Sequence, residues 1–306
     1  MKKPDFATLK VLKVIRPHIV LGGMLAFSIG VLLAIIQGGI FRFEMIALGY
    51  ATVLLGDLSA HFSNDYFDVE IDAHSEKRKM FAGSKILVEN PSLRLLSRNI
   101  SVSLLICSSV IAAASVFFLG APIELFAIMF VANLVGWFYS APPMRLISRG
   151  LGEIAVAWVT GFVIPAIGYL SVRNQFDATF LYLSIPFMLY GFILSLSLHA
   201  PDAEFDKRSG KKTLIVRRGT QITVSLILLA SSLASLILFS YYFYHVFEIL
   251  NVGIIFGLSI VTLAIIFLGF IKYGKNKKLT NFANLNIASL FLFNMLLVAY
   301  LIYAIF

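Results

Sequence analysis

Long runs of apolar residues recur along the whole chain, and they limit what it can fold into. A helix needs about 20 apolar residues to cross a bilayer, and soluble domains carry about 25% charged residues. This chain is 59% hydrophobic and only 13% charged. The sequence therefore predicts an all-α membrane protein with nine transmembrane helices, at 18–38, 44–66, 95–119, 122–140, 150–171, 178–201, 220–245, 249–271 and 282–305.

The lysines and arginines are distributed unevenly among the connecting loops. If the N-terminus lies in the cytoplasm, 23 of the 25 basic residues fall on cytoplasmic segments, with Arg42 and Arg173 as the exceptions. Cytoplasmic loops of membrane proteins carry such an excess. We therefore predict a multi-pass protein of the cell membrane whose N-terminus and basic loops are cytoplasmic. The net charge of +9 then indicates topology and attraction to anionic lipid, and no nucleic-acid partner is expected.

Half of the acidic residues, eight of 16, gather in two short stretches that follow the second and sixth apolar runs. The spacing Asp68-x-x-x-Asp72 is repeated as Asp202-x-x-x-Asp206. We interpret this as an internal repeat of four helices, the second to fifth and the sixth to ninth, with the first helix as an extra. The whole chain, 1–306, would form a single domain with both acidic stretches on the cytoplasmic side.

The two acidic stretches have the composition of a metal-diphosphate site. On a helix, Asp65, Asp68 and Asp72 lie on one face because they are spaced i, i+3 and i+7, and Asp202 and Asp206 share a face in the same way. Like charges at this spacing repel, so a compensating cation is expected. Mg²⁺ takes one or two carboxylates per ion and completes its shell with water and phosphate oxygens. Two facing patches would therefore hold a diphosphate through Mg²⁺.

Four stretches of the sequence resemble the motifs of a known family. "NDYFDVEID" (64–72) and "DAEFDKRSGKKTL" (202–214) are similar to the paired aspartate motifs of the UbiA superfamily of intramembrane prenyltransferases. "YSAPPMRL" (139–146) and "RP" (16–17) resemble two shorter motifs of that family. The resemblance implies a bundle of helices around a central cavity, with both aspartate motifs facing each other at its cytoplasmic end.

The resemblance also implies roles for individual residues. The expected catalytic residues are Asp65, Asp68, Asp72, Asp202, Asp206 and Tyr139, the tyrosine ring stabilising a prenyl cation. The expected metal ligands are Asn64, Asp68, Asp72, Asp202 and Asp206. The basic residues expected to bind substrate through its phosphates are Arg16, Lys77, Arg78, Arg145, Arg149, Lys211 and Lys212. Many family members carry a lysine where this chain has Ile147, so we expect Arg145 or Arg149 to replace it.

The activity that the resemblance implies is Mg²⁺-assisted transfer of a prenyl chain from a prenyl diphosphate to a lipophilic or aromatic acceptor. We favour an acceptor of the quinone-precursor type. An archaeal-type geranylgeranylglyceryl phosphate prenyltransferase is the alternative within the family. A secondary transporter is the alternative from another class, because internal repeats and intramembrane acids also mark transporters.

Three polar residues inside apolar runs receive a structural interpretation. His61 and His199 each precede an aspartate motif by three residues, counted to Asn64 and Asp202. Buried structural histidines are commoner than functional ones, so we expect both to be structural. Cys107 is the single cysteine, which excludes an internal disulfide, and we expect it to be a buried small hydrophobe.

Overall fold

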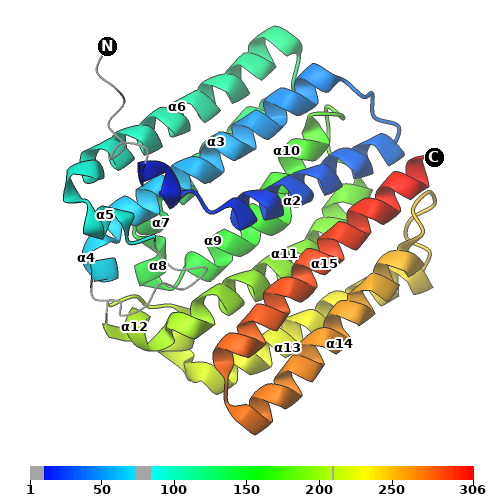
Figure 1. Ribbon diagram of the computed structural model, residues 1–306. Helices are drawn as coiled ribbons and strands as arrows, with labels where there is room; N and C mark the ends of the chain where they lie inside the picture. Colours follow the sequence, from blue (N-terminus) through cyan, green and yellow to red (C-terminus); the bar gives the residue numbers. More distant parts are fainter. Residues whose placement is uncertain (1–9, 74–83, 209) are drawn as a thin grey trace.

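The computed structural model describes residues 10–73, 84–208 and 210–306, and within them nine helices are long and apolar enough to cross a membrane (Figure 1). The described part contains helices and no strand, which confirms the predicted fold class. The spanning helices are α2 (Pro17–Ile36), α3 (Phe43–Phe67), α6 (Arg94–Leu119), α7 (Ile123–Ser140), α9 and α10 (Gly152–Trp158 and Ile164–Leu170, joined by a π-helical turn over Val159–Val163), α11 (Ala178–His199), α13 (Leu214–Phe243), α14 (Val252–Asn276) and α15 (Leu279–Ile305).

The predicted helix limits agree with the structure to within a few residues, and the two larger differences have local causes. Helix α13 begins at Leu214, but Gly219 has φ 83° and ψ 167°, so the helical path is broken there. The predicted start at 220 marks that break. Helix α14 continues to Asn276, beyond the predicted end at 271, because its last two turns carry the exposed residues Lys272 and Lys275, whose long side chains extend to water from a helical backbone.

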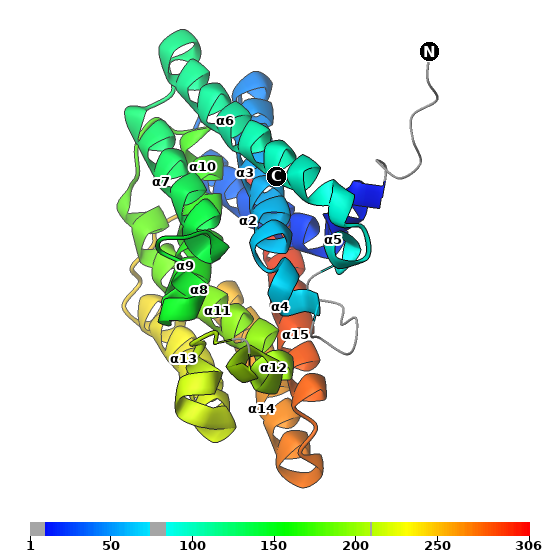
Figure 2. The same cartoon turned by 90° about the vertical axis from the view of Figure 1, so that its left-hand side faces the viewer.

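The helices surround one cavity. Its lining comes from α2, α3, α7, α9 and α10, α11 and α15, whereas α6, α13 and α14 pack on the outer side of these helices (Figure 2). Short elements gather at one end of the bundle: η1 (Lys10–Val14), α4 (Val69–Ala73), α5 (Ile86–Glu89), α8 (Leu146–Arg149), η4 (Ala200–Asp202) and α12 (Ala203–Arg208). Both acidic motifs lie at this end.

Helices α2 and α10 approach each other backbone to backbone. A Cβ atom added to Gly30 would lie 1.9 Å from the carbonyl oxygen of Pro165, and one added to Gly168 would lie 2.3 Å from that of Phe27. Small residues allow such close approach between membrane helices, where van der Waals contact replaces the hydrophobic effect as the driving force. The first helix is therefore fixed against the wall of the cavity.

Hydroxyl groups fix α3 against α6. Ser59 and Ser101 each donate to the other's backbone carbonyl, at 2.9 and 2.7 Å, and Ser97 donates to the carbonyl of Phe62 at 3.1 Å. Ser108 donates to the carbonyl of Thr52 at 2.8 Å. These bonds satisfy buried polar groups in an apolar setting. They hold α3, which carries the first aspartate motif, at a defined rotation.

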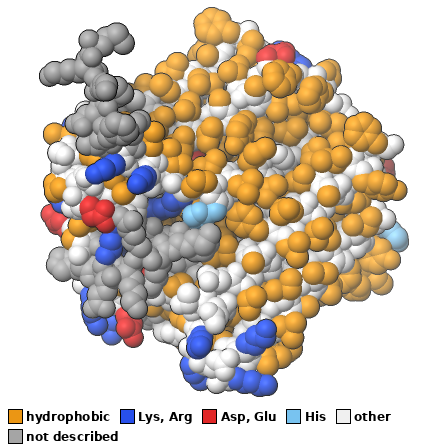
Figure 3. Space-filling view, viewed as in Figure 1, with side chains coloured by type: hydrophobic (Ala, Val, Ile, Leu, Met, Phe, Trp, Pro, Cys, Tyr) orange, Lys and Arg blue, Asp and Glu red, His pale blue; other side chains and the backbone are white. Residues whose placement is uncertain are grey.

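One face of the molecule is largely apolar. Hydrophobic side chains cover most of the face in Figure 3, and lysines and arginines gather at its left and lower edges. Cys107 lies exposed on α6, so the prediction that it is buried is wrong. An apolar run that spans a membrane faces lipid on one side, and the sequence alone does not give that side.

Candidate active site

The first acidic motif lies where α3 ends and α4 begins. Asn64 and Asp65 lie in the last turn of α3, and the backbone N–H of Asp68 donates to the carbonyl of Asn64 at 2.9 Å. Asp68 caps the helix with φ −95° and ψ 5°, and Asp72 belongs to the separate helix α4. The predicted continuous stripe from Asp65 to Asp72 is therefore wrong, because the helix is interrupted at Asp68. The side chain of Asp72 lies outside the described structure.

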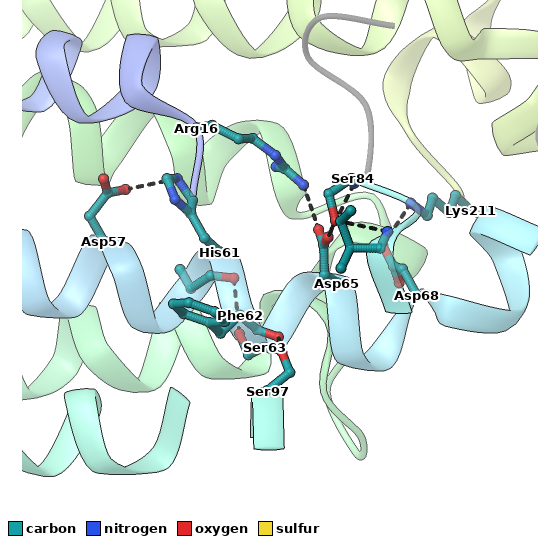
Figure 4. Close-up of polar contacts among 12 residues, drawn as sticks. Arg16, Asp57, His61, Phe62, Ser63, Asp65, Asp68, Ser84, Ser97 and Lys211 are labelled. Atoms are coloured by element: carbon teal, nitrogen blue, oxygen red, sulfur yellow. Dashed lines mark hydrogen bonds and ion pairs between the residues drawn. The ribbon is translucent and has the colours of Figure 1, made fainter. Parts of the chain in front are cut away.

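Asp65 is buried and both of its carboxylate oxygens have partners. Oδ1 accepts from Arg16 Nη2 at 2.6 Å, and Oδ2 accepts from the backbone N–H of Ser84 at 3.1 Å and from its hydroxyl (Figure 4). These bonds tie the end of α3 to the residue before α2 and to the chain at Ser84. The contacts of Asp65 are therefore those of a residue that holds the motif in place.

The second motif follows a change of helix type. Helix α11 ends at His199, the chain passes through the 3₁₀ turn η4, and α12 then carries Asp206. Pro201, in η4, has no backbone N–H to donate, which explains why the α-helix ends here. Asp202 lines the cavity, and Asp206, which also lines it, is buried with its side chain 5% exposed.

Lys211 joins the two motifs. Its Nζ lies 2.9 Å from Asp68 Oδ2, and its backbone N–H donates to the carbonyl of Asp206 at 3.0 Å. Gly210 supplies the turn that brings Lys211 back, with φ 73°. The ion pair connects residues 143 positions apart in the sequence. The structure thus brings together at one end of the cavity the two acidic ends that the sequence pattern paired.

Helix α7 contributes Tyr139 to the same end of the cavity. The Tyr139 hydroxyl lies 3.1 Å from His199 Nε2, and His199 Nδ1 lies 3.8 Å from Asp206 Oδ2. Tyr139, His199 and Asp206 all line the cavity. The expectation that His199 is purely structural is therefore incomplete, because this histidine lies between Tyr139 and the second acidic motif.

The cavity has a volume of about 380 Å³ and a clear division of character. Both acidic motifs and Lys211 line one end of it. The apolar lining comes from α2, α10, α11 and α15, with side chains that include Ile164, Phe187, Leu290 and Phe291. Such a cavity accommodates a molecule with an anionic head and an apolar tail.

Three oxygens at the polar end have the chemistry of ligands for a hard cation. Asn64 Oδ1, Asp68 Oδ1 and Asp206 Oδ2 are buried and lack a hydrogen-bond partner within the described residues. Buried polar atoms without partners are rare, because they have lost water without compensation. No group of three or more His, Cys, Asp or Glu side chains in the described ranges is already arranged around a metal position. Lys211 draws Asp68 instead.

The predicted basic residues separate into two groups. Arg16 and Lys211 line the cavity. Arg145, Arg149 and Lys212 are not part of its lining, and Arg149 donates to the carbonyl of Pro143 at 2.9 Å instead. Ile147 does line the cavity, so neither arginine takes the place of the family lysine there. Lys77 and Arg78 lie outside the described residues.

Two acidic residues were missed or undervalued in the sequence analysis. Glu153 on α9 is buried and accepts from the backbone N–H of Leu214 at 2.5 Å, which fixes the N-terminus of α13 after the second motif. Asp57 lines the cavity two turns before the first motif. Its signal is an acid inside an apolar run, where charge is costly and marks function.

The fold and the cavity together define a multi-pass membrane protein with an internal cavity that is acidic at one end. Residues 24–304 match the UbiA prenyltransferase family, and the chain belongs to that family. This membership decides for a prenyltransferase and against a secondary transporter.

Individual relatives agree with this assignment. The 1,4-dihydroxy-2-naphthoate octaprenyltransferase of Bacillus subtilis is 21% identical over 222 residues, which are 72% of this chain and 68% of that one. The 2-carboxy-1,4-naphthoquinone phytyltransferase of Synechocystis sp. is 34% identical over 92 residues, or 30% of each chain. The structure of a UbiA homolog from Archaeoglobus fulgidus bound to GPP and Mg²⁺ superposes with a TM-score of 0.73 at 19% identity, over 97% of this chain and 99% of that one.

Proposed function

We propose that this protein transfers a prenyl chain from a prenyl diphosphate to an aromatic quinone precursor. The observation that carries the proposal is the meeting of Asp68 and Lys211, from opposite motifs, at one end of a cavity with an apolar wall. A prenyl diphosphate has the matching form, with a charged head and a long hydrocarbon tail.

Mg²⁺ fits the polar end of this cavity. Asn64, Asp68 and Asp206 each offer a buried oxygen that lacks a hydrogen-bond partner among the residues the structure describes. Each Mg²⁺ needs only one or two carboxylates when water and phosphate supply the other ligands, so a complete protein cage is not required. When bound, Mg²⁺ would neutralise the charge that develops on the departing diphosphate. Asp72 and Asp202 would complete the metal-binding set, by their positions in the motifs.

The basic residues of the cavity have complementary tasks in this proposal. Lys211 would donate to a phosphate oxygen as substrate enters, because its ammonium group has three N–H donors and the contact with Asp68 uses one. Arg16 would stay with Asp65 and fix the end of α3. Tyr139 would present its ring to the prenyl cation, because an aromatic face attracts positive charge. The apolar wall would limit capture of that cation by water.

The acceptor is proposed from the relatives. Both named sequence relatives carry naphthoate or naphthoquinone acceptors in their names. An aromatic acceptor of this kind is apolar enough to enter from the membrane and carries polar groups that can be oriented. We place the polar end of the cavity on the cytoplasmic side of the cell membrane, because the basic loops lie at that end.

The test is prenyl transfer by the purified protein. Labelled geranylgeranyl diphosphate and Mg²⁺ are offered with 1,4-dihydroxy-2-naphthoate, 4-hydroxybenzoate or geranylgeranylglyceryl phosphate. We expect a prenylated naphthoate, and no product after removal of Mg²⁺ by EDTA or in the variants Asp68→Ala and Asp202→Ala. Product from the glycerol phosphate alone would replace the quinone-precursor assignment with the archaeal-type one. Undiminished turnover in either variant would refute the site.

A further inference from the structure

Asp57 and His61 form a second polar pair in the cavity. Both residues lie on α3, one turn apart, and Asp57 Oδ1 lies 3.6 Å from His61 Nε2. Figure 4 places them on the same side of α3 as Asp65 and its partner Arg16. The Ser97 contact of that helix lies on its opposite side. The pair therefore belongs to the cavity wall and not to the α3–α6 interface.

His61 is buried with unused bonding capacity. Its side chain is 5% exposed, and neither ring nitrogen has a hydrogen-bond partner within residues 10–73, 84–208 and 210–306. An imidazole held away from water without a partner loses free energy on folding, and native structures avoid this unless another molecule supplies the bond. His61 is one of the residues that line the cavity, so a molecule bound there can supply the missing partner.

The position of the pair indicates which ligand. With a rise of about 1.5 Å per residue, His61 lies about 6 Å from Asp65 along α3, on the side away from the diphosphate end. Small residues adjoin the pair in the lining, since Ala60 precedes His61 and a Cβ atom added to Gly136 would lie 3.6 Å from that of Ala60. A carboxylate at Asp57 repels phosphate, so this part of the cavity favours a neutral group that donates a proton.

We propose that Asp57 and His61 bind the hydroxyl group of the acceptor and take its proton. The proposal deepens, and rests on, the proposed transfer to a hydroxylated aromatic. Asp57 faces Nε2 and favours the tautomer protonated there, which leaves Nδ1 free to accept from the acceptor. Arg16, which also lines the cavity, is the cation on this side of α3, and its guanidinium is paired with Asp65.

The chemical step balances as follows. The bond between prenyl C1 and the diphosphate oxygen breaks, and its electron pair leaves with the diphosphate. The hydroxyl proton of the acceptor passes to His61 Nδ1, and Asp57 stabilises the resulting imidazolium. The activated ring carbon bonds to C1, and the hydrogen on that carbon moves to the oxygen and restores the hydroxyl group. The proton on His61 then passes to the departing diphosphate or to water.

The experiment separates acceptor chemistry from donor binding. His61→Ala and Asp57→Asn are compared with His245→Ala, an exposed histidine outside the cavity lining. Transfer to 1,4-dihydroxy-2-naphthoate should fall about 100-fold in His61→Ala, the usual contribution of a general base, and less in Asp57→Asn. Mg²⁺-dependent binding of geranylgeranyl thiolodiphosphate, which does not ionise, should remain as in the wild type. Added imidazole should restore much of the transfer by His61→Ala.

Two results would overturn the proposal. One is transfer by His61→Ala at the wild-type rate. The other is a loss that imidazole does not restore and that extends to binding of the thiolodiphosphate, because that pattern marks a structural defect. Asp68→Asn is the opposite control, since it should lose thiolodiphosphate binding that imidazole does not recover.

A binding measurement tests the pair even if the proposed transfer fails. Titration of the wild type with 1,4-dihydroxy-2-naphthoate, followed by tryptophan fluorescence, should give saturable binding. His61→Phe should weaken it by about tenfold, as expected for one lost hydrogen bond, and His245→Ala should not. Equal affinity in the wild type and His61→Phe, or no binding of any hydroxylated aromatic to the wild type, would remove the pair from the acceptor site.

Discussion

Asp65 and Asp68 lie three positions apart in one motif, yet their surroundings differ. Asp65 is paired with Arg16 and Ser84, and its side chain is 2% exposed. The side chain of Asp68 lines the cavity and is 13% exposed; one oxygen contacts Lys211, and the other is buried with no hydrogen-bond partner among the described residues. The sequence motif does not distinguish these two residues. Their contacts do, because those of Asp65 are typical of a structural anchor and those of Asp68 are typical of a ligand.

Substitution of Asp65 should therefore affect mainly stability, and substitution of Asp68 should affect mainly activity. Asp65→Asn should lower the free energy of unfolding by about 3 kcal/mol, because Arg16 is left with its charge buried and uncompensated. Asp68→Asn should lower prenyl transfer by about 10²-fold, as expected when one electrostatic stabiliser of the transition state is lost, with a smaller effect on stability. Thermal unfolding in detergent measures the loss of stability, and the transfer assay measures the loss of activity. Equal loss of stability in the two variants would contradict this division.

Sequence patterns anticipated the acids of the site better than its bases. The spacing of Asp68, Asp202 and Asp206 pointed to one site because their repetition is improbable by chance. Lysines and arginines near cytoplasmic helix ends serve topology as well as substrate, so spacing could not separate Lys211 from Arg145 and Arg149. Only the tertiary fold shows that Lys211 turns inward while the two arginines stay outside the lining.

At the scale of helices, hydropathy predicted the spans but not how they pack. The nine apolar runs were long enough to be unambiguous, and their ends were accurate to within a few residues except at the start of α13 and the end of α14. Gly30 packs against Pro165, and these two residues lie on helices that are far apart in the sequence. No periodicity of apolar residues predicts this contact. The same holds for the Ser59–Ser101 bonds that set the rotation of α3.

A methyl group at Gly30 should separate α2 from α10. Gly30→Ala places a Cβ 1.9 Å from a backbone oxygen, whereas Gly257→Ala on α14 meets no atom within 4 Å. We expect Gly30→Ala to lower the free energy of unfolding by about 1–3 kcal/mol, the usual cost of overpacking. Gly257→Ala, the matched control, should be neutral or stabilising, since alanine favours helix. Identical melting of the two variants would mean that α2 and α10 pack differently.

At the scale of the whole molecule, the distribution of charge predicts how the bundle sits in the membrane. In a Cys107→Ser background, Lys275→Cys at the end of α14 and Glu44→Cys at the start of α3 provide reporters at opposite ends of the bundle. A membrane-impermeant maleimide should label Glu44→Cys in intact cells and Lys275→Cys only after permeabilisation, because basic ends remain inside. The reverse pattern would place the site on the outer side.

The internal repeat of four helices and the single domain over 1–306 remain predictions. The structure sets Asp68 and Lys211 in contact, as a pseudo-symmetric pair of acidic ends would require. Each half would then contribute one carboxylate end to a shared site, which neither half could form alone.

Cooperation between the two motifs is the central claim, and a double-mutant cycle tests it most directly. Mg²⁺-dependent binding of geranylgeranyl thiolodiphosphate is measured for the wild type, Asp68→Asn, Asp206→Asn and the double variant. Residues that share a ligand do not act independently, whereas distant ones have additive effects on free energy. We predict that each single change weakens binding strongly and that the double variant loses much less than the product of both effects. Losses that multiply would contradict a single shared site.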